Sequence, residues 1–347
     1  MFTENVEDSP LLASVIIVNY NGESYLKRLF ESLCSQSLSS SMYEVIFVDN
    51  SSTDNSLKIL NQNKEKYASL RIRIIINSTN SGFIKGNNIG LKYSRGKYLV
   101  LLNNDTYVEF HWLEELLEVM EKNPTVGICE SAEIVYETDG NTSLCLGVPF
   151  GILRRSKEKK EMTKTSEGLV EGFFYSSGAC LAIRRDIIDK FGRLFDERDL
   201  LGDLDLSWEV RLLGFRILSN QKSICHHFYG HATRIVYKKQ RDQEYMHFHD
   251  NFLAMFKNYS FKRLMKRFPI YFITSIFTSL FRSIQIRKPV VWGLARALIW
   301  NFINLRGTLV DHYKIDRIRK ISDDDIESFM LPYPNELYYL KLKLSHK

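Results

Sequence analysis

Short apolar segments alternate with segments of helical periodicity over the first 130 residues, and this alternation constrains the fold most strongly. The apolar, strand-like runs are residues 13–19, 44–48, 71–76, 98–102 and 126–129. Apolar residues recur at helical spacing within residues 23–36, 54–66 and 109–122. Strands that alternate with helices in this way form βαβ units with right-handed crossovers. We therefore predict an α/β fold, Rossmann-like, with a mostly parallel sheet and helices on both faces.

Polar side chains follow two of these predicted strands at the point where each strand ends. Residues 44–48 lead into Asp49-Asn50-Ser51-Ser52, and residues 98–102 lead into Asn103-Asn104-Asp105-Thr106. Ligands of open α/β sheets bind outside the carboxyl ends of the strands. Asp49 and Asp105 are thus predicted to face a ligand, the alternative being turns that use Asn and Asp for local hydrogen bonds.

The middle of the chain carries a second set of polar candidates. Residues 137–170, with a basic run at 154–160, indicate a loop or lid, and residues 172–185 indicate a strand interrupted at Gly178-Ala179. A helix is predicted to begin at Asp203, where free backbone N–H groups stabilise a carboxylate. A last short strand, residues 224–228, carries His226 and His227.

The basic excess of the chain belongs to its C-terminal third. Residues 238–320 contain 17 Lys and Arg against 5 Asp and Glu, whereas the other residues contain 30 against 36. The apolar stretches 269–281 and 289–305 are shorter than the roughly 20 residues of a spanning helix. We predict a boundary near residue 237 and, over 238–347, a basic helical extension at a membrane surface. The alternative is packing on the preceding domain or on a second copy, as a homodimer.

Cysteine usage and the N-terminus indicate a cytoplasmic protein. The five cysteines are scattered and include no C-x-x-C pair, which argues against a disulfide framework and a cysteine zinc site. Residues 1–12 are acidic and lack the basic-then-apolar pattern of a signal peptide.

Seven motifs, in order, resemble the family 2 glycosyltransferases, in particular their rhamnosyltransferase-like branch. They are SVIIVNYNG (14–22), EVIFVDNSSTDNS (44–56), NSGFIKGNNIGLKYSRGKYLVLLNNDTYV (80–108), SGACLAIRRDII (177–188), FGRLFDE (191–197), GDLDLSWEVRLLGF (202–215) and a histidine shortly after, within residue 231. The resemblance implies a GT-A fold over residues 1–237, with a nucleotide-binding half at about 13–130 and an acceptor half at about 131–237. It also implies inverting transfer of a sugar from a nucleotide diphosphate to an acceptor hydroxyl.

Donor binding is assigned to strand-end and turn residues of these motifs. Asp49 is suited to accept hydrogen bonds from a base or ribose, Gly82 and Gly86 to allow close backbone approach, and Asn88 to offer an amide. The full predicted set is Asn19, Tyr20, Asn21, Asp49, Asn50, Ser51, Gly82, Phe83, Gly86, Asn88 and Asn104.

A metal and a base complete the implied chemistry. Asp105 stands where the family binds its metal, and Mg²⁺ or Mn²⁺ there would offset the charge of the leaving diphosphate. His226 or His227 is the candidate for a further ligand. Asp203 matches the catalytic base, with Asp205 as the second candidate.

Three departures from the family pattern qualify this reading. The metal motif is Asn-Asn-Asp rather than Asp-x-Asp, Gly202 replaces the usual Glu before the base, and Glu209 stands where Arg is frequent. These changes leave open a non-catalytic relative that binds nucleotide sugars and acts as a scaffold.

The expected acceptor is lipid-linked or a growing polysaccharide on the inner face of the cell membrane, and the donor is dTDP-rhamnose or a UDP-hexose. A sugar nucleotidyltransferase is disfavoured, because Asn19-Tyr20-Asn21-Gly22 occupies the place of its Gly-rich phosphate loop. No recognition motif accompanies the basic tail, so no nucleic-acid partner is predicted.

Overall fold

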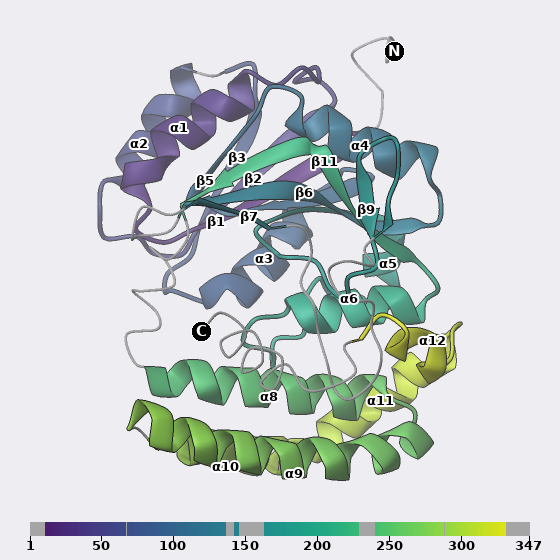
Figure 1. Ribbon diagram of the computed structural model, residues 1–347. Helices are drawn as coiled ribbons and strands as arrows, with labels where there is room; N and C mark the ends of the chain where they lie inside the picture. The colour runs from purple at the N-terminus through teal and green to yellow at the C-terminus, as the bar shows by residue number, and fades with distance from the viewer. Residues whose placement is uncertain are drawn as a thin grey trace.

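A central sheet with helices on both faces stands above a layered set of C-terminal helices (Figure 1). The computed structural model describes residues 11–66, 68–136, 142–145, 163–228, 240–287 and 289–330. The sheet contains 11 strands. Nine follow one path, β3-β2-β1-β4-β10-β6-β11-β9-β8, while β5 pairs with β11 and β7 with β6 outside that path.

The first half of the sheet is the predicted parallel one. Strands β1 (Ala13–Asn19), β2 (Tyr43–Asp49), β3 (Arg71–Ile76) and β4 (Tyr98–Leu102) pair in parallel in the order β3-β2-β1-β4. Because side chains alternate along a strand, Val15 and Ile17 enter one core and Ile16 the other.

Each of these two cores is covered by its own helices. Helices α1 (Glu23–Cys34), α2 (Ser56–Lys66) and α4 (Trp112–Lys122) cover the first. Helices α3 (Gly82–Tyr93), α5 (Arg185–Phe191) and α6 (Asp203–Leu212) cover the second. The predicted α/β class, with helices on both faces, is confirmed.

The second half of the sheet is mixed and differs from the prediction. Strand β10 (Cys180–Arg184) runs antiparallel between β4 and β6 (Val126–Tyr136). Strand β11 (Arg216–His227) is parallel to β6 and antiparallel to β5 (Thr106–Val108). Strands β6 and β11 are longer than the predicted runs 126–129 and 224–228. The prediction was too short because polar residues interrupt the apolar pattern within both strands. Residues 172–179, predicted as strand, form none.

Part of the predicted loop 137–170 is also strand. Strands β7 (Thr142–Cys145), β8 (Thr163–Lys164) and β9 (Leu169–Glu171) extend the edge of the sheet. The basic run 154–160, and with it the predicted lid, lies outside the described residues.

The predicted helical extension is present. It consists of α8 (Gln240–Asn258), α9 (Phe261–Ile286), α10 (Val290–Ile303), α11 (Leu305–Ile318) and α12 (Asp323–Glu327). Within the described part of the chain, no helix combines the length and apolar character needed to cross a bilayer.

The extension shares a core with helix α6 of the sheet domain. Trp208 and Leu212 of α6 belong to one buried cluster with Phe252 and Met255 of α8. The predicted boundary near residue 237 falls outside the described residues, and the helices on its two sides pack as one unit.

Candidate active site

Three strand ends are joined by one buried amide, that of Asn19 at the end of β1. Its Nδ2 donates to Asp49 Oδ1 at 3.0 Å, at the end of β2. Its Oδ1 accepts from Asn104 Nδ2 at 2.8 Å, beyond β4. A Cβ at Gly22 would lie 2.3 Å from Asn19 Oδ1, so this junction requires glycine there. The structure thus joins Asn19, Asp49 and Asn104, three of the residues assigned to donor binding, and their contact with a donor stays a prediction.

Asp49 lies inside this junction. Its side chain is fully buried, and its two carboxylate oxygens accept from the Ser52 hydroxyl and the Ser52 backbone N–H at 2.6 and 2.9 Å. The partly exposed residues of the same loops are Tyr20, Asn21 and Ser51. In this structure Asp49 orders the loop, and those neighbours present polar groups at the surface.

The turn before α3 is tied to the same region. Asn50 Oδ1 accepts from Ser81 Oγ at 2.9 Å, and Asn50 Nδ2 donates to the carbonyl of Gly82 at 3.1 Å. Gly82 has φ +77° and open space around it, and the neighbouring Phe83 is partly exposed. The segment 81–83 therefore remains available to a ligand.

Two other predicted donor contacts have different surroundings. A Cβ at Gly86 would lie 2.6 Å from Val18 Cγ1, so this glycine lets α3 approach β1 closely. The Asn88 amide is buried, donates to the carbonyl of Phe195 at 2.8 Å and accepts from the Leu194 and Phe195 N–H groups. The expected ligand contacts of Gly86 and Asn88 do not fit this structure, because both serve packing inside the protein.

Asp105 and His227 contact each other where β5 pairs with β11. The pairing of β5 with β11 places His227 opposite Thr106, next to Asp105, and His227 Nε2 lies 3.1 Å from Asp105 Oδ1. His227 Nδ1 contacts the Glu133 carboxylate. Burial alone would lower the pKa of His227, but hydrogen bonds with Asp105 and Glu133 raise it to about 10.

His226, the alternative candidate, points to the opposite face of β11. It contacts Glu109 Oε1 at 3.2 Å and the Tyr136 hydroxyl at 2.9 Å, and it stacks on Tyr107. Adjacent residues of a strand project to opposite sides. His226 is therefore separated from Asp105, and of the two candidate histidines His227 is the one that contacts it.

The residues around Asp105 fit a divalent metal held together with a diphosphate. If His227 lost its proton and bound a metal, Glu133 would hold its second nitrogen, an arrangement that is common in metal sites. Across the described residues, no group of three or more His, Cys, Asp or Glu is arranged so that it could hold a metal ion by itself. Magnesium commonly takes one or two protein carboxylates and completes its shell with phosphate oxygens and water.

Asp203 is the first residue of α6, as predicted. Its carboxylate lies against Gly178, which precedes a residue bonded to the loop that carries Asp105. A Cβ at Gly178 would lie 2.3 Å from Asp203 Oδ1. The next residue, Ala179, accepts a hydrogen bond from the Asn103 N–H at 2.9 Å. One short segment, 178–179, thus connects the carboxylate of Asp203 to the loop that carries Asp105.

The surroundings of Asp203 favour its protonated form more than water does. Its Oδ1 is buried and accepts no hydrogen bond from the described residues. Burial raises the pKa of Asp203 to about 7, the Gly178 N–H opposes the shift, and the charges of Glu133 and Asp250 add to it. A pKa near neutrality is what a general base needs at physiological pH.

Asp205, the second base candidate, belongs to a buried charge network. Its carboxylate contacts the Lys257 ammonium and accepts from Asn258 Nδ2 at 2.7 Å. The fully buried Lys257 of α8 also lies 3.1 Å from Asp196 and 3.3 Å from Glu209. Burial alone would lower the pKa of Lys257, but Asp205 and Glu209 raise it above its ordinary value. Asp205 therefore anchors α8 to α6.

Gly202, the residue before Asp203, has a conformation that excludes the usual Glu. Its φ is +83°, and a Cβ would lie 2.5 Å from Ile84 Cδ1 and 2.7 Å from Phe195 Cδ1. L-residues are strained at such φ values. The backbone before Asp203 is therefore built around glycine in this chain.

Glu133 and Lys257 are two residues of this region that sequence reasoning missed. Glu133 lies in the part of β6 beyond Cys129, where a Glu-Ser-Ala-Glu run breaks the apolar pattern. Lys257 is one lysine among many in the basic C-terminal third. The β-branched pair Ile134 and Val135 directly after Glu133 is the local signal for the longer strand. Nothing local marks Lys257 as buried.

A mostly parallel sheet with a polar junction at its strand ends and a carboxylate at the start of a nearby helix is the architecture of GT-A glycosyltransferases. A model of glycosyl transferase family 2 matches residues 14–192, and the chain belongs to this family.

Curated relatives share parts of the chain. An uncharacterized glycosyltransferase of Haemophilus influenzae is 34% identical over 137 residues, which are 39% of this chain and 40% of that protein. A poly(ribitol-phosphate) beta-glucosyltransferase of Bacillus spizizenii is 36% identical over 96 residues, 27% of this chain and 15% of that protein. The chain thus spans less than half the length of each of these relatives.

Solved structures share the fold. The mannosyltransferase PcManGT from Pyrobaculum calidifontis, in complex with GDP-Man and Mn²⁺, has a TM-score of 0.54 at 13% identity and covers 91% of this chain and 89% of its own. Staphylococcus aureus TarS residues 1–349 with UDP-GlcNAc has a TM-score of 0.53 at 18% identity, with coverages of 72% and 67%.

Proposed function

We propose that the protein is an inverting glycosyltransferase that moves a sugar from a nucleotide diphosphate to an acceptor hydroxyl. The observation that carries the proposal is the short connection between Asp105 with His227 and Asp203, through Asn103 and the segment 178–179. This arrangement sets a candidate diphosphate–metal site beside a candidate base.

In this proposal Asp203 accepts the proton of the acceptor hydroxyl as its oxygen attacks the anomeric carbon. The bond from that carbon to the diphosphate breaks on the opposite side, so the configuration inverts. Asp105 and His227 would hold a divalent cation, which when bound would supply positive charge to the leaving diphosphate. Asn19, Asp49 and Ser52 keep the strand-end loops ordered, while Tyr20, Asn21, Ser51 and the turn 81–83 contact the nucleotide sugar.

The donor and acceptor are proposed from weaker support. Solved structures of similar fold hold UDP-GlcNAc or GDP-Man. The motif series resembles the rhamnosyltransferase-like branch, so dTDP-rhamnose belongs in the donor panel beside UDP-hexoses and GDP-mannose. We propose a lipid-linked or polysaccharide acceptor, reached by a cytoplasmic protein bound peripherally to the inner face of the membrane.

The test is release of nucleotide diphosphate from each donor, with Mg²⁺ or Mn²⁺ and a membrane lipid extract as the acceptor source. Asp105→Ala and Asp203→Asn run beside the unaltered protein, and Asp189→Asn, an exposed position on α5, is the matched control. Release from one donor that both site variants lose and the control keeps supports the proposal.

A second candidate, a nucleotide-sugar-binding scaffold, has one specific observation behind it. Gly202 stands where the family usually has Glu, and its backbone leaves no room for a side chain. The scaffold predicts that calorimetry detects donor binding while no nucleotide diphosphate is released with any acceptor. That result would replace the enzymatic proposal.

A further inference from the structure

Exposed apolar side chains gather on the C-terminal helices. Of the 21 large hydrophobic side chains exposed among the described residues, 16 lie on α9, α10 and α11. Figure 1 shows α9 and α10 side by side as the layer farthest from the sheet, with α8 between this layer and α6. Apolar patches this extensive mark interaction sites on soluble proteins. We refer to the exposed stripes of α9 and α10 as the outer face.

The stripe on α9 is regular. Ile270, Ile273, Phe277, Leu280 and Ile284 follow one another at spacings of three and four residues, and all are exposed; Phe277 is 68% and Ile284 79% accessible. This spacing puts the side chains on one side of the helix over about four turns. The opposite side of α9 carries Leu264 and Tyr271, which are buried in the core shared with α8.

Neighbouring α10 adds a stripe of the same kind. Trp292, Ile299 and Phe302 are 60%, 59% and 78% accessible, while Leu294 and Ala297 face the core. The exposed side chains therefore do not result from loose packing of the helices. Each helix has one side packed in the core and a second, equally apolar side in solvent.

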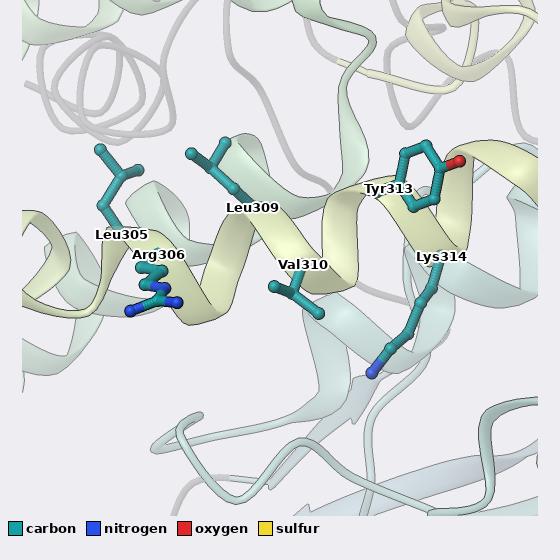
Figure 2. A pocket seen from close by; sticks show the side chains of 6 residues that line it. All are labelled: Leu305, Arg306, Leu309, Val310, Tyr313 and Lys314. Carbon is teal, nitrogen blue, oxygen red and sulfur yellow. The ribbon is translucent and has the colours of Figure 1, made fainter.

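The apolar surface continues onto α11 in smaller form. A hollow of about 630 Å³ there is lined by Leu305, Leu309, Val310 and Tyr313 together with the basic Arg306 and Lys314. Figure 2 shows Leu305, Leu309 and Tyr313 projecting to one side of α11, and Arg306, Val310 and Lys314 to the other. Helix α11 thus combines exposed apolar side chains with basic ones.

Charge identifies the occupant of the outer face. Residues 261–310 contain nine Lys and Arg and no Asp or Glu. The exposed Lys262 and Lys266 continue the α9 stripe toward the N-terminus at the same spacing. A second copy of the chain would bring the same basic excess against this one, which opposes a homodimer through this face. An anionic bilayer offers both an apolar interior and negative headgroups.

We propose that the outer face docks on an anionic lipid bilayer. The stripes around Phe277, Ile284 and Phe302 enter the boundary between headgroups and acyl chains, and Lys262 and Lys266 contact lipid phosphates. The helices lie on the membrane and do not span it. This proposal rests on the proposed function in one respect, that the membrane would supply the acceptor. Docking itself is measured without any sugar donor.

The test is flotation of the purified protein with vesicles of phosphatidylcholine alone or mixed with phosphatidylglycerol. We expect binding to the mixed vesicles that weakens as salt is raised. Phe277→Ser with Ile284→Ser should lower the partition coefficient at least about tenfold, because each side chain loses its burial in lipid. Lys262→Glu with Lys266→Glu should lower it roughly thirtyfold or more.

Matched controls change the same residue types elsewhere on the surface. Ile76→Ser with Phe110→Ser removes two exposed apolar side chains of the sheet domain, and Lys92→Glu with Lys122→Glu reverses two exposed charges there. Both controls should float like the unaltered protein, and thermal unfolding should confirm that all variants are folded.

Three outcomes would overturn the proposal. They are no binding of the unaltered protein to mixed vesicles, equal losses in outer-face variants and controls, and a dimer in sedimentation that Phe277→Ser with Ile284→Ser dissociates. The last would assign the face to a second copy. Nucleotide diphosphate release, measured separately, shows whether the catalytic proposal stands or fails independently of docking.

Discussion

The imidazole Nε2 of His227 lies 3.1 Å from Oδ1 of Asp105, although the two residues are 122 positions apart in the chain. The pairing of β5 with β11 brings them together, and Glu133 from β6 holds the other imidazole nitrogen. The three side chains form a small buried unit, two of them from strands β6 and β11 and Asp105 from the turn before β5.

Glu133→Gln should weaken metal binding at this unit. Loss of the carboxylate that orients a ligating histidine typically lowers metal affinity 10–100-fold. The measurement is the Mn²⁺ dependence of nucleotide diphosphate binding by titration calorimetry. Glu109→Gln is the matched control, because Glu109 contacts the neighbouring His226. Equal effects of the two changes would count against a metal at Asp105 and His227.

The transfer rate should fall in acid as Asp203 takes up a proton. With its pKa at about 7, the carboxylate is a base only above that pH, so kcat/KM should drop about tenfold per unit below it. Asp203→Asn should lose about 10²–10⁴ in kcat and with it this pH dependence. A pH profile for the unaltered enzyme that is flat down to about pH 5 would exclude Asp203 as the base.

The same substitution should stabilise the protein. The folded-state pKa of Asp203 is raised from 3.8 to about 7, so the folded state binds the proton more tightly and stability falls as pH rises between these values. Asp203→Asn removes that cost, by up to about 4 kcal/mol above pH 7. Urea unfolding should show the gain at pH 8 and little of it at pH 4; a gain independent of pH would contradict the assignment.

Lys257→Met should destabilise the protein severely. The change removes the cation that lies among Asp196, Asp205 and Glu209 and leaves buried carboxylates without it. Breaking a buried ion pair from one side costs about 3–5 kcal/mol. Equilibrium urea unfolding measures this loss. Lys122→Met, which removes an exposed ion pair with Glu118, should change the free energy of unfolding little. Similar losses in both variants would mean that the buried charge network stabilises the protein no more than an exposed ion pair does.

Gly202→Ala should cost more than Gly192→Ala. Both glycines have positive φ, +83° and +67°, but a Cβ at Gly192 meets nothing within 4 Å, whereas one at Gly202 meets Ile84 and Phe195. We expect about 1–2 kcal/mol for Gly192→Ala from backbone strain alone. Gly202→Ala should lose roughly 1–3 kcal/mol more from overpacking. Equal unfolding midpoints would show that the loop before Asp203 adjusts freely.

The parts of the site that depend on local pattern were predictable. The ends of β1, β2 and β4 follow from apolar runs stopped by Asn and Asp, and the start of α6 follows from Asp203 before a helical repeat. In parallel strands such ends meet at one edge, so the meeting of Asn19, Asp49 and Asn104 follows from local patterns.

The parts of the site that depend on long-range packing could not be predicted from the sequence. The choice between His226 and His227 is set by the register of β5 against β11, which no local pattern specifies. The amide of Asn88 looks free in sequence, yet it is used by Leu194 and Phe195, over 100 residues away. In the sequence, Lys257 does not differ from the other basic residues of the C-terminal third. Its burial follows from the packing of α8 on α6, which no local pattern specifies.

The packing of α8 against α6 also determines how far Asp203 lies from the outer face. Asp203 belongs to α6, Lys257 of α8 contacts Asp205 of α6, and α9 and α10 lie beyond α8 in the same buried cluster. With the outer face on a bilayer, the base would stand at one set distance above the lipid. The enzyme would then act as a ruler and select, among chemically similar acceptors, those whose hydroxyl reaches that level.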